Sequence, residues 1–377
     1  MILNKLYQQF PTTSKPDFKL LGLAVWLTIF GIIMIMSSSN VIGYQEHNQS
    51  FYFVTRHFIF IFIGIFAFFT AYIFPHQFIR RFSWLILSGA IFLTMLTHIP
   101  GIGITISGST RWIKFLGLTF QPSELVKFAA LLFTADFLDK YQEIINKNLR
   151  LFLVLVAIIG ASASVVLTQP DLGTTIVIGM VFLVQILVAC VPMQWLLSMG
   201  GLVGLVGALS ILARPYQLAR VQGFLNPWAD KYGKGFHVIQ SMIAVGSGGL
   251  FGLGFGQSRQ KFFYLPQQYT DFIFAIICEE LGFILTIILF LLPMTIFYIK
   301  CYFVAIRQTT LYSKLLIIGI TTWLSFQSLF NIAVSINLAP TKGITLPFIS
   351  FGGTSIVMAL AVTGIIMNAS RYQQRIH

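Results

Sequence analysis

Residues 20–36 read LLGLAVWLTIFGIIMIM, an uninterrupted apolar run near the N-terminus. A helix needs about 20 mostly apolar residues to cross a bilayer, and comparable runs follow one another along the 377 residues. The first run ends in Ser37-Ser38-Ser39-Asn40 without a small-x-small cleavage site, so we expect an uncleaved first membrane span rather than a signal peptide. The pattern predicts an all-α, polytopic membrane protein.

The composition supports this class. Hydrophobic residues make up 56% of the chain and charged residues only 9%, whereas a soluble domain carries roughly a quarter charged residues. The 24 Lys and Arg exceed the 11 Asp and Glu, giving a net charge of +13. In a soluble protein this excess could indicate nucleic-acid binding. Here, basic residues that flank membrane spans and meet anionic headgroups explain it better, so we expect membrane lipids and no nucleic acid as partners.

Hydropathy predicts about ten spans within a single domain covering residues 1–377. The predicted spans are 18–38, 51–73, 83–98, 123–138, 151–168, 173–190, 194–212, 271–299, 313–336 and 353–370. If the N-terminus is cytoplasmic, twelve basic residues fall in inner segments, and only Arg111, Lys114 and Lys342 fall in short outer loops. This bias follows the positive-inside rule, so we expect both termini in the cytoplasm.

Two predicted outer segments are longer than a tight connection. Residues 100–122 mix aromatic, apolar and basic side chains, which suits a segment lying at the membrane interface. Residues 214–270, between spans seven and eight, are basic and glycine-rich but also apolar and aromatic. Loops of this length are usually functional or disordered, and the apolar content favours a structured loop folded against the outer membrane face. No convincing internal repeat is visible, which weakens a transporter interpretation.

Ionisable residues at membrane depth are functional candidates by default. Asp271 opens the eighth predicted span, where Thr270 could be the N-cap and the carboxylate would lie in the first helical turn. From spacing alone, a purely structural role in the first helical turn is therefore at least as plausible as a catalytic one. The helix dipole would also lower the pKa of this carboxyl, which opposes a role as general base unless burial raises the pKa again. On a helix, Glu279 would lie about 80° from Asp271 and Glu280 on the opposite face, so both cannot serve one site with it.

Other charged residues have ambiguous roles. Asp171 lies at a tight turn, where a capping role is favoured. Lys342 lies in a stretch rich in proline and glycine that dictates a specific backbone path, with a re-entrant path as one option, and it could contact headgroups or hold a phosphate. Arg111 has the same two alternatives. Glu124 and Lys127 are three residues apart on one predicted helix and could simply pair with each other.

Several long motifs in a fixed order resemble the SEDS family (shape, elongation, division and sporulation), and the resemblance extends from the first span to the last. The motifs are RWI at 111–113, QPSEL at 121–125, QPDLGT at 169–174, GFHVIQS at 235–241, GSGGLFG at 246–252 and TDFIFAIICEELG at 270–282. The resemblance implies a ten-span polymerase of peptidoglycan strands that uses lipid II and works with a class B penicillin-binding transpeptidase. It also implies that Asp271, in the TDFIF motif, is the essential acidic residue.

Within the family, residues 257–266 (QSRQKFFYLP) and 340–350 (PTKGITLPFIS) look more like the division branch than the elongation branch. The resemblance then implies other division proteins as partners and a place in the bacterial cytoplasmic membrane, at the division septum. The stretch 266–271 reads PQQYTD, where many division-type members have an upstream Pro-Glu and His-Thr-Asp. A nearby acidic group is missing, which puts a second carboxylate role in this loop in doubt.

The implied reaction needs a base near the acceptor hydroxyl and cations near the departing pyrophosphate. We expect Asp271 to be the catalytic base. The expected substrate-binding residues are Lys342, Arg111, Arg220, Lys261 and Glu280. A divalent cation, Mg or Mn, could share the second task, although no cluster in the sequence resembles a dedicated metal cage. Two other functions stay open: transport of the lipid-linked precursor across the membrane, and a non-catalytic scaffold for division.

Overall fold

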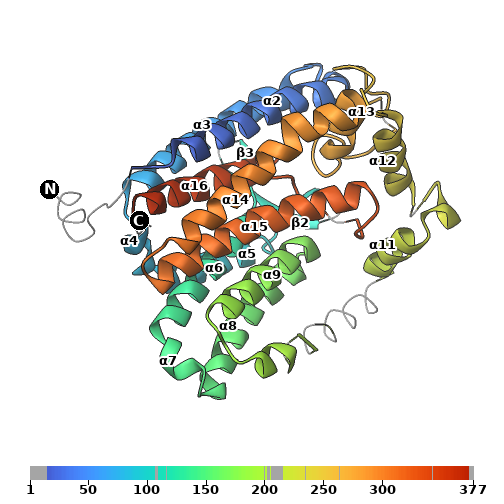
Figure 1. The fold of residues 1–377 in the computed structure, drawn as a ribbon. Helices are drawn as coiled ribbons and strands as arrows, with labels where there is room; N and C mark the ends of the chain where they lie inside the picture. Colours follow the sequence, from blue (N-terminus) through green and yellow to red (C-terminus); the bar gives the residue numbers. More distant parts are fainter. Residues whose placement is uncertain are drawn as a thin grey trace.

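Long helices packed side by side form the body of the molecule (Figure 1). The computed structural model describes residues 15–106, 109–115, 117–198, 200–201, 204, 215–233, 235–262, 264–341 and 343–372. In chain order the elements are α2 (Phe18–His47), α3 (Tyr52–Ile73), α4 (His76–Arg80), α5 (Ser83–Leu96), β1 (Gly103–Ile106), β2 (Ser109–Phe115), β3 (Leu118–Phe120), α6 (Pro122–Lys140), α7 (Gln142–Ile145), α8 (Leu149–Thr168), α9 (Leu172–Val188), α11 (Pro215–Leu225), the 3₁₀ turn η1 (Pro227–Asp230), α12 (Phe236–Ser247), α13 (Ile273–Thr286), the π-helical turn η2 (Ile287–Leu291), α14 (Leu292–Ile306), α15 (Leu311–Ser335), α16 (Gly353–Ala369) and η3 (Ser370–Tyr372).

Helices long and apolar enough to cross a bilayer confirm that this is an integral membrane protein. Among the described residues there are six: Phe18–His47, Tyr52–Ile73, Leu149–Thr168, Ile273–Ile306, Leu311–Ser335 and Gly353–Tyr372. The predicted spans near α5, α6 and α9 coincide with helices that are shorter or less apolar. The predicted span 194–212 lies largely outside the described residues.

Helices α15 and α16 occupy the middle of the bundle, where α3, α6, α9 and α14 pack around them. Glycines bring α3 and α16 close together. A Cβ on Gly64 of α3 would come within 2.6 Å of Leu360 Cδ1, and one on Gly364 of α16 would overlap the Phe68 carbonyl. Since lipid supplies little hydrophobic drive between helices, small residues that allow close packing are a main source of helix association in membranes.

The predicted eighth span, 271–299, is a broken helix. The helical segment runs from Ile273 to Ile306, but Gly282 has φ 71° and ψ −179°, which interrupts the helical hydrogen bonds. The glycine-rich loop supplies hydrogen bonds to helix carbonyls at this break. For example, Leu253 N–H donates to the Glu279 carbonyl at 3.0 Å. Backbone polar groups away from water must find partners inside the protein. The loop and the break therefore stabilise each other.

The segment 100–122 corrects the all-α expectation. It folds into a three-stranded antiparallel sheet in the order β1-β2-β3, with Trp112 opposite Ile104 and Ile113 opposite Phe120. Branched and aromatic side chains favour paired strands, and Gly117 at φ 79° provides the turn into β3. The chain is therefore mostly helical with one small sheet.

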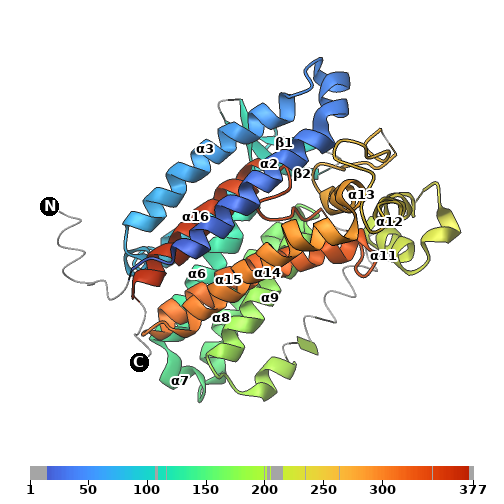
Figure 2. The same ribbon diagram turned by 45° about the horizontal axis from the view of Figure 1, so that its top comes forward.

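The predicted long loop, 214–270, is structured, as expected. It contains α11, η1 and α12, followed by the irregular glycine-rich stretch. Helix α12 packs against α13 and α15, and Ser241 Oγ donates to the Ser335 carbonyl at 2.7 Å. Figure 2 shows α11 and α12 beside the start of α13. This is the end of the bundle opposite to the one where α2 begins and α16 ends (Figure 1).

Candidate active site around Asp271

Asp271 lies in a turn before α13, not in the first turn of the helix as predicted. The helix begins at Ile273, and its N-cap position is Phe272, whose side chain makes no capping hydrogen bond. The turn is closed by Gln267, whose carbonyl accepts from the Thr270, Asp271 and Phe272 amides at 3.1 to 3.3 Å. Gln267 has φ 56°, a left-handed conformation that no simple helix pattern predicts. The helical angle expected between Asp271 and Glu279 therefore does not apply.

The loop between α15 and α16 crosses this turn. Asn331 Nδ2, on α15, donates to the Asp271 carbonyl at 2.8 Å and to the Ile344 carbonyl at 2.7 Å. Ser350 Oγ donates to the Thr270 carbonyl at 2.5 Å. One buried amide and one hydroxyl thus fix the loop against the backbone that carries the carboxylate.

Gly343 shows how closely this loop approaches the carboxylate. A Cβ at Gly343 would lie 3.3 Å from Asp271 Oδ2. Lys342, the predicted phosphate ligand next to it, lies outside the described residues. The described neighbours on both sides, Thr341 and Gly343, line the cavity in which Asp271 lies.

Asp271 opens into a cavity of about 470 Å³ between α11, α12 and the loop before α16. Its described lining residues are Ala219, Arg220, Asp230, Gly233, His237, Gln267, Asp271, Phe272, Thr341 and Gly343. Arg220 Nη1 donates to the Thr341 carbonyl at 2.8 Å, which joins α11 to the loop that contains Gly343. The structure therefore brings together two of the predicted residues, Asp271 and Arg220, in one open cavity.

The surroundings of Asp271 raise the pKa of its carboxyl. Burial, with a smaller contribution from the nearby Asp171 charge, raises its pKa to about 6, against the opposing effects of Arg220 and Arg111. The helix dipole was expected to lower this pKa, but Asp271 precedes the helix. A carboxyl with a pKa near 6 is largely ionised at neutral pH and more basic than an ordinary aspartate, which suits a general base.

Arg111 of β2 and Asp171, in the turn before α9, interact with each other near this site. Arg111 Nε donates to the Gln169 carbonyl at 2.8 Å, and Nη2 donates to the Pro170 carbonyl at 2.7 Å. Arg111 Nη1 lies 3.9 Å from Asp171 Oδ1. Asp171 caps α9 by accepting from Thr174 N at 3.1 Å, so its predicted capping role is confirmed. Arg111 thus ties β2 to this turn and contributes its charge to the site from outside the described lining of the cavity.

Glu124 and Lys127 form the predicted ion pair, with Lys127 Nζ 2.8 Å from Glu124 Oε1. The pair is buried, and Lys127 Nζ also donates to Gln327 Oε1 at 3.0 Å. Gln327 Nε2 donates in turn to the Thr345 carbonyl at 2.8 Å. The pair therefore anchors α6 and α15 to the same loop that Asn331 holds.

Lys261 and Glu280 lie together in a second, buried cluster. Lys261 Nζ is 3.5 Å from Glu280 Oε1 and also donates to the Gly256 carbonyl. Ser37 Oγ of α2 donates to Glu280 at 2.6 Å. Neither Lys261 nor Glu280 is among the described residues that line the Asp271 cavity. The structure places these two predicted substrate-binding residues where they join the glycine-rich loop to α13 and α2.

Glu279, next to Glu280, is also engaged by that loop. Ser258 Oγ donates to Glu279 Oε2 at 2.5 Å, and Arg259 N donates to Oε1 at 2.9 Å. Both glutamates are about 1% exposed. Structural pairing was the expected role for at least one of them, and the hydrogen bonds of both side chains to the loop and to α2 are structural.

His237 is a cavity residue that no sequence pattern singled out. Its ring stacks on Phe272, with centroids 6.2 Å apart and planes 18° apart. Burial and the Arg220 charge lower its pKa, so the imidazole is neutral at physiological pH and can both donate and accept a hydrogen bond. The only signal was its place in the GFHVIQS motif, where nothing distinguished it from a packed helix residue.

The described residues form no dedicated metal cage of three or more side chains. Across the residues that the structure describes, no three His, Cys, Asp or Glu side chains converge on one point. Asp271 and Asp230 are the carboxylates in the described cavity lining, and Mg²⁺ is usually bound through one or two carboxylates together with waters and substrate phosphates.

Comparisons with known proteins agree across the whole chain. The profile of the cell cycle protein family that includes FtsW, RodA and SpoVE matches residues 18–375. Stage V sporulation protein E of Bacillus subtilis is 40% identical over 371 residues, covering 96% of this chain and all of that protein. The probable peptidoglycan glycosyltransferase FtsW of Coxiella burnetii is 39% identical and covers 90% of this chain and 92% of its own.

Solved structures show the same fold. A chain of a peptidoglycan synthase complex, studied for the structural coordination of polymerization and crosslinking, superposes with a TM-score of 0.76 at 25% identity and covers 95% of this chain and 99% of its own. The rod shape determining protein RodA of Thermus thermophilus superposes with a TM-score of 0.69 at 24% identity, covering 95% and 98%.

Proposed function

This chain belongs to the family of cell cycle proteins that includes FtsW, RodA and SpoVE, and from that premise we propose that it is a peptidoglycan glycosyltransferase that polymerises lipid II during cell division. One observation carries the proposal within the structure. A half-buried carboxylate, Asp271, opens into a large cavity together with the cation Arg220. The family relationship and this geometry support the same reaction.

The proposed reaction joins two lipid-linked saccharides. The oxygen of an acceptor sugar hydroxyl forms a bond to the anomeric carbon of the donor, while the bond between that carbon and the pyrophosphate oxygen breaks. The hydroxyl proton passes to the Asp271 carboxylate, and the pyrophosphate leaves with the electron pair. A base with a pKa near 6 remains ionised at neutral pH and is strong enough to assist the attack.

Positive charge beside the carboxylate is the second requirement. Arg220 lies in the cavity lining, and its bond to the Thr341 carbonyl holds it next to the loop that continues through Lys342. Arg and Lys both bind phosphate oxygens. We propose that Arg220 and Lys342 bind the departing pyrophosphate and that Arg111, which lies outside the described cavity lining, adds positive charge near the site. A divalent cation could enter with the pyrophosphate, and no step above requires a resident metal.

His237 extends the proposal to the sugar. A neutral imidazole held by stacking on Phe272 offers one donor and one acceptor to the cavity. Saccharide hydroxyls need such paired donors and acceptors. We propose that His237 positions a sugar ring, whereas Lys261 and Glu280 maintain the broken helix that follows Asp271.

The charges and the exposed apolar surfaces support a specific placement in the membrane. We propose ten crossings, both termini in the cytoplasm and the Asp271 cavity at the outer face of the bacterial cytoplasmic membrane, at the septum. Exposed apolar side chains along the long helices, such as Phe62 and Phe66 of α3, suit contact with lipid tails. A class B penicillin-binding transpeptidase is the proposed partner, in line with the polymerisation and crosslinking coordinated in the structurally similar synthase complex.

Proteoliposomes that contain labelled lipid II test this function against the two alternatives. A polymerase predicts glycan chains on a gel for wild-type protein with its transpeptidase, and no faster lipid II translocation than in protein-free vesicles. Accelerated translocation without chains would indicate a transporter. Neither activity, with the complex intact and a control polymerase working in the same vesicles, would indicate a scaffold.

A further inference from the structure

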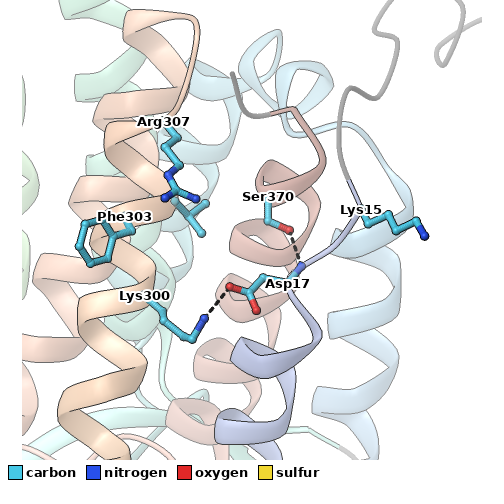
Figure 3. A pocket seen from close by; sticks show the side chains of 7 residues that line it. Lys15, Asp17, Lys300, Phe303, Arg307 and Ser370 are labelled. Atoms are coloured by element: carbon cyan, nitrogen blue, oxygen red, sulfur yellow. Dashed lines mark hydrogen bonds and ion pairs between the residues drawn. The ribbon is translucent and has the colours of Figure 1, made fainter. Parts of the chain in front are cut away.

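A second pocket lies at the far end of the molecule from Asp271. The helical segment that starts two residues after Asp271 runs through 34 residues to Ile306, at the opposite end of the bundle. There, the ends of α14 and α16 meet the start of α2 around a pocket of about 180 Å³. Figure 3 shows its lining: Lys15, Asp17, Lys300, Phe303, Val304, Arg307 and Ser370.

One carboxylate in this pocket is already satisfied. Asp17 Oδ2 accepts from Lys300 Nζ at 2.9 Å, and Asp17 Oδ1 caps α2 by accepting from Lys19 N and Leu20 N. These bonds lower the pKa of Asp17 despite its partial burial, so it stays ionised at neutral pH. Asp17 N donates to Ser370 Oγ at 3.2 Å, which ties the start of α2 to the end of α16 (Figure 3).

The cations of the pocket outnumber its carboxylates. With Asp17 paired to Lys300, the charges of Lys15 and Arg307 are left over, and neither forms an ion pair with any residue in the described part of the chain. Arg307 Cζ lies 6.0 Å from the Phe303 ring, a distance at the edge of a cation–π contact. The pocket therefore has a formal excess of two positive charges and space for a small anionic group.

An apolar strip leads into this pocket. On α14 the exposed large apolar side chains are Leu292, Ile296, Ile299, Phe303 and Ile306, spaced three or four residues apart and so on one face of the helix. Phe303 belongs to both the strip and the pocket lining. The strip is part of a membrane-spanning helix, which places lipid chains along it and headgroups at its end.

We propose that this pocket binds the phosphate headgroup of an anionic phospholipid from the leaflet on the side opposite to Asp271. The headgroup phosphate lies beside Arg307, which faces the pocket from α14 as Lys300 does, while one acyl chain follows the strip on α14. Lys15, whose amino group points away from Asp17 (Figure 3), adds positive charge at the rim of the pocket. Bound lipid would neutralise the end of the bundle where α2, α14 and α16 are joined. A soluble phosphate would satisfy the charges but would leave the strip on α14 without a role.

Native mass spectrometry of the purified full chain in detergent tests this site with phosphatidylglycerol and with phosphatidylcholine of the same acyl chains. The double variant Lys15→Gln/Arg307→Gln should bind phosphatidylglycerol about tenfold or more weakly, since each basic residue at a membrane surface contributes about one kcal/mol toward anionic lipid. The matched control Lys147→Gln/Arg150→Gln removes two exposed cations elsewhere and should bind like wild type. Arg307→Lys should keep most of the affinity.

Three results would overturn the proposal. Equal retention of the two lipids by wild-type protein would show that charge is not recognised. An equal loss in both double variants would show a general charge effect rather than a site. Full displacement of phosphatidylglycerol by millimolar glycerol phosphate would assign the pocket to a soluble phosphate. The melting temperatures of all variants check that the bundle remains folded.

Discussion

The pH dependence of polymerisation is the sharpest consequence of the environment of Asp271. If its carboxylate is the base, the rate falls as the carboxyl becomes protonated, so the acidic limb of the profile reports its pKa. The kcat/KM profile reports the free enzyme, which is the state that the structure describes. Because burial raises the pKa to about 6 from an ordinary value of 3.8, the limb should lie near pH 6.

The loss of kcat/KM at pH 5 distinguishes a raised pKa of Asp271 from the ordinary aspartate pKa. With a pKa of about 6, roughly a tenth of the carboxyl is ionised at pH 5, and kcat/KM should be about a tenth of its plateau. With an ordinary aspartate pKa, about nine-tenths would be ionised at pH 5, and kcat/KM would hardly change. Initial rates of labelled lipid II consumption between about pH 4.5 and 8.5 measure this directly.

Two variants assign the limb to Asp271. Arg220 lowers the pKa of Asp271, so Arg220→Gln should move the limb to higher pH, whatever it does to the plateau. His237→Gln removes the imidazole from the described cavity lining. If the acidic limb reports Asp271, it should stay at the same pH in this variant. A limb near pH 4, or one that disappears in His237→Gln, would refute the assignment of a tuned carboxylate base at Asp271.

Three further substitutions test the supports of the site. Gly282→Ala should lower the free energy of unfolding by more than about 3 kcal/mol, because φ is 71° and a Cβ would overlap Gly252 N; thermal denaturation measures this. Asn331→Ala removes both amide bonds that fix the carboxylate turn and its loop, and should slow polymerisation about tenfold to a hundredfold in the gel assay. Lys261→Met leaves Glu280 buried without its cation and should cost about 3 to 5 kcal/mol of stability.

Each of these has a control within the chain. Gly246→Ala should be nearly neutral, because no atom beyond its chain neighbours and the backbone of its own helix lies within 4 Å of its Cβ position, and equal losses at the two glycines would contradict the strain argument. Asn331→Asp replaces the donating Nδ2 by an oxygen that faces the same two carbonyls and cannot donate to them, so it should be at least as slow as Asn331→Ala. Lys261→Met combined with Glu280→Gln should recover part of the stability; an additive loss would show that the two side chains do not act as a pair.

Much of the fold could be predicted from sequence because the bilayer imposes a simple requirement. An apolar run of the right length forms a helix, and the runs at 51–73 and 353–370 became α3 and α16 within a residue or two. The sheet at 103–120 escaped prediction because its apolar and polar residues also fit an interfacial segment. The break at Gly282 escaped because a glycine in an apolar run is common in membrane helices.

The site was harder to predict from the sequence, because irregular turns and contacts between distant segments bring its residues together. Asp271 was identified from a motif, but its place before the helix depends on the left-handed Gln267. Lys261 and Glu280 look like substrate ligands in sequence, yet their partners include the Gly256 carbonyl and Ser37, the latter far along the chain. No local pattern predicts such distant contacts.

Glycan-chain formation by Asp271→Asn tests the catalytic role of this carboxylate most directly. Wild type, Asp271→Asn and the remote control Glu143→Gln are purified with the cognate transpeptidase and given labelled lipid II, and chains are read on a gel. A base at Asp271 predicts chains from wild type and Glu143→Gln and a loss of at least about a hundredfold in Asp271→Asn, with unchanged melting temperature. Chains from Asp271→Asn at the wild-type rate would remove this carboxylate from the mechanism.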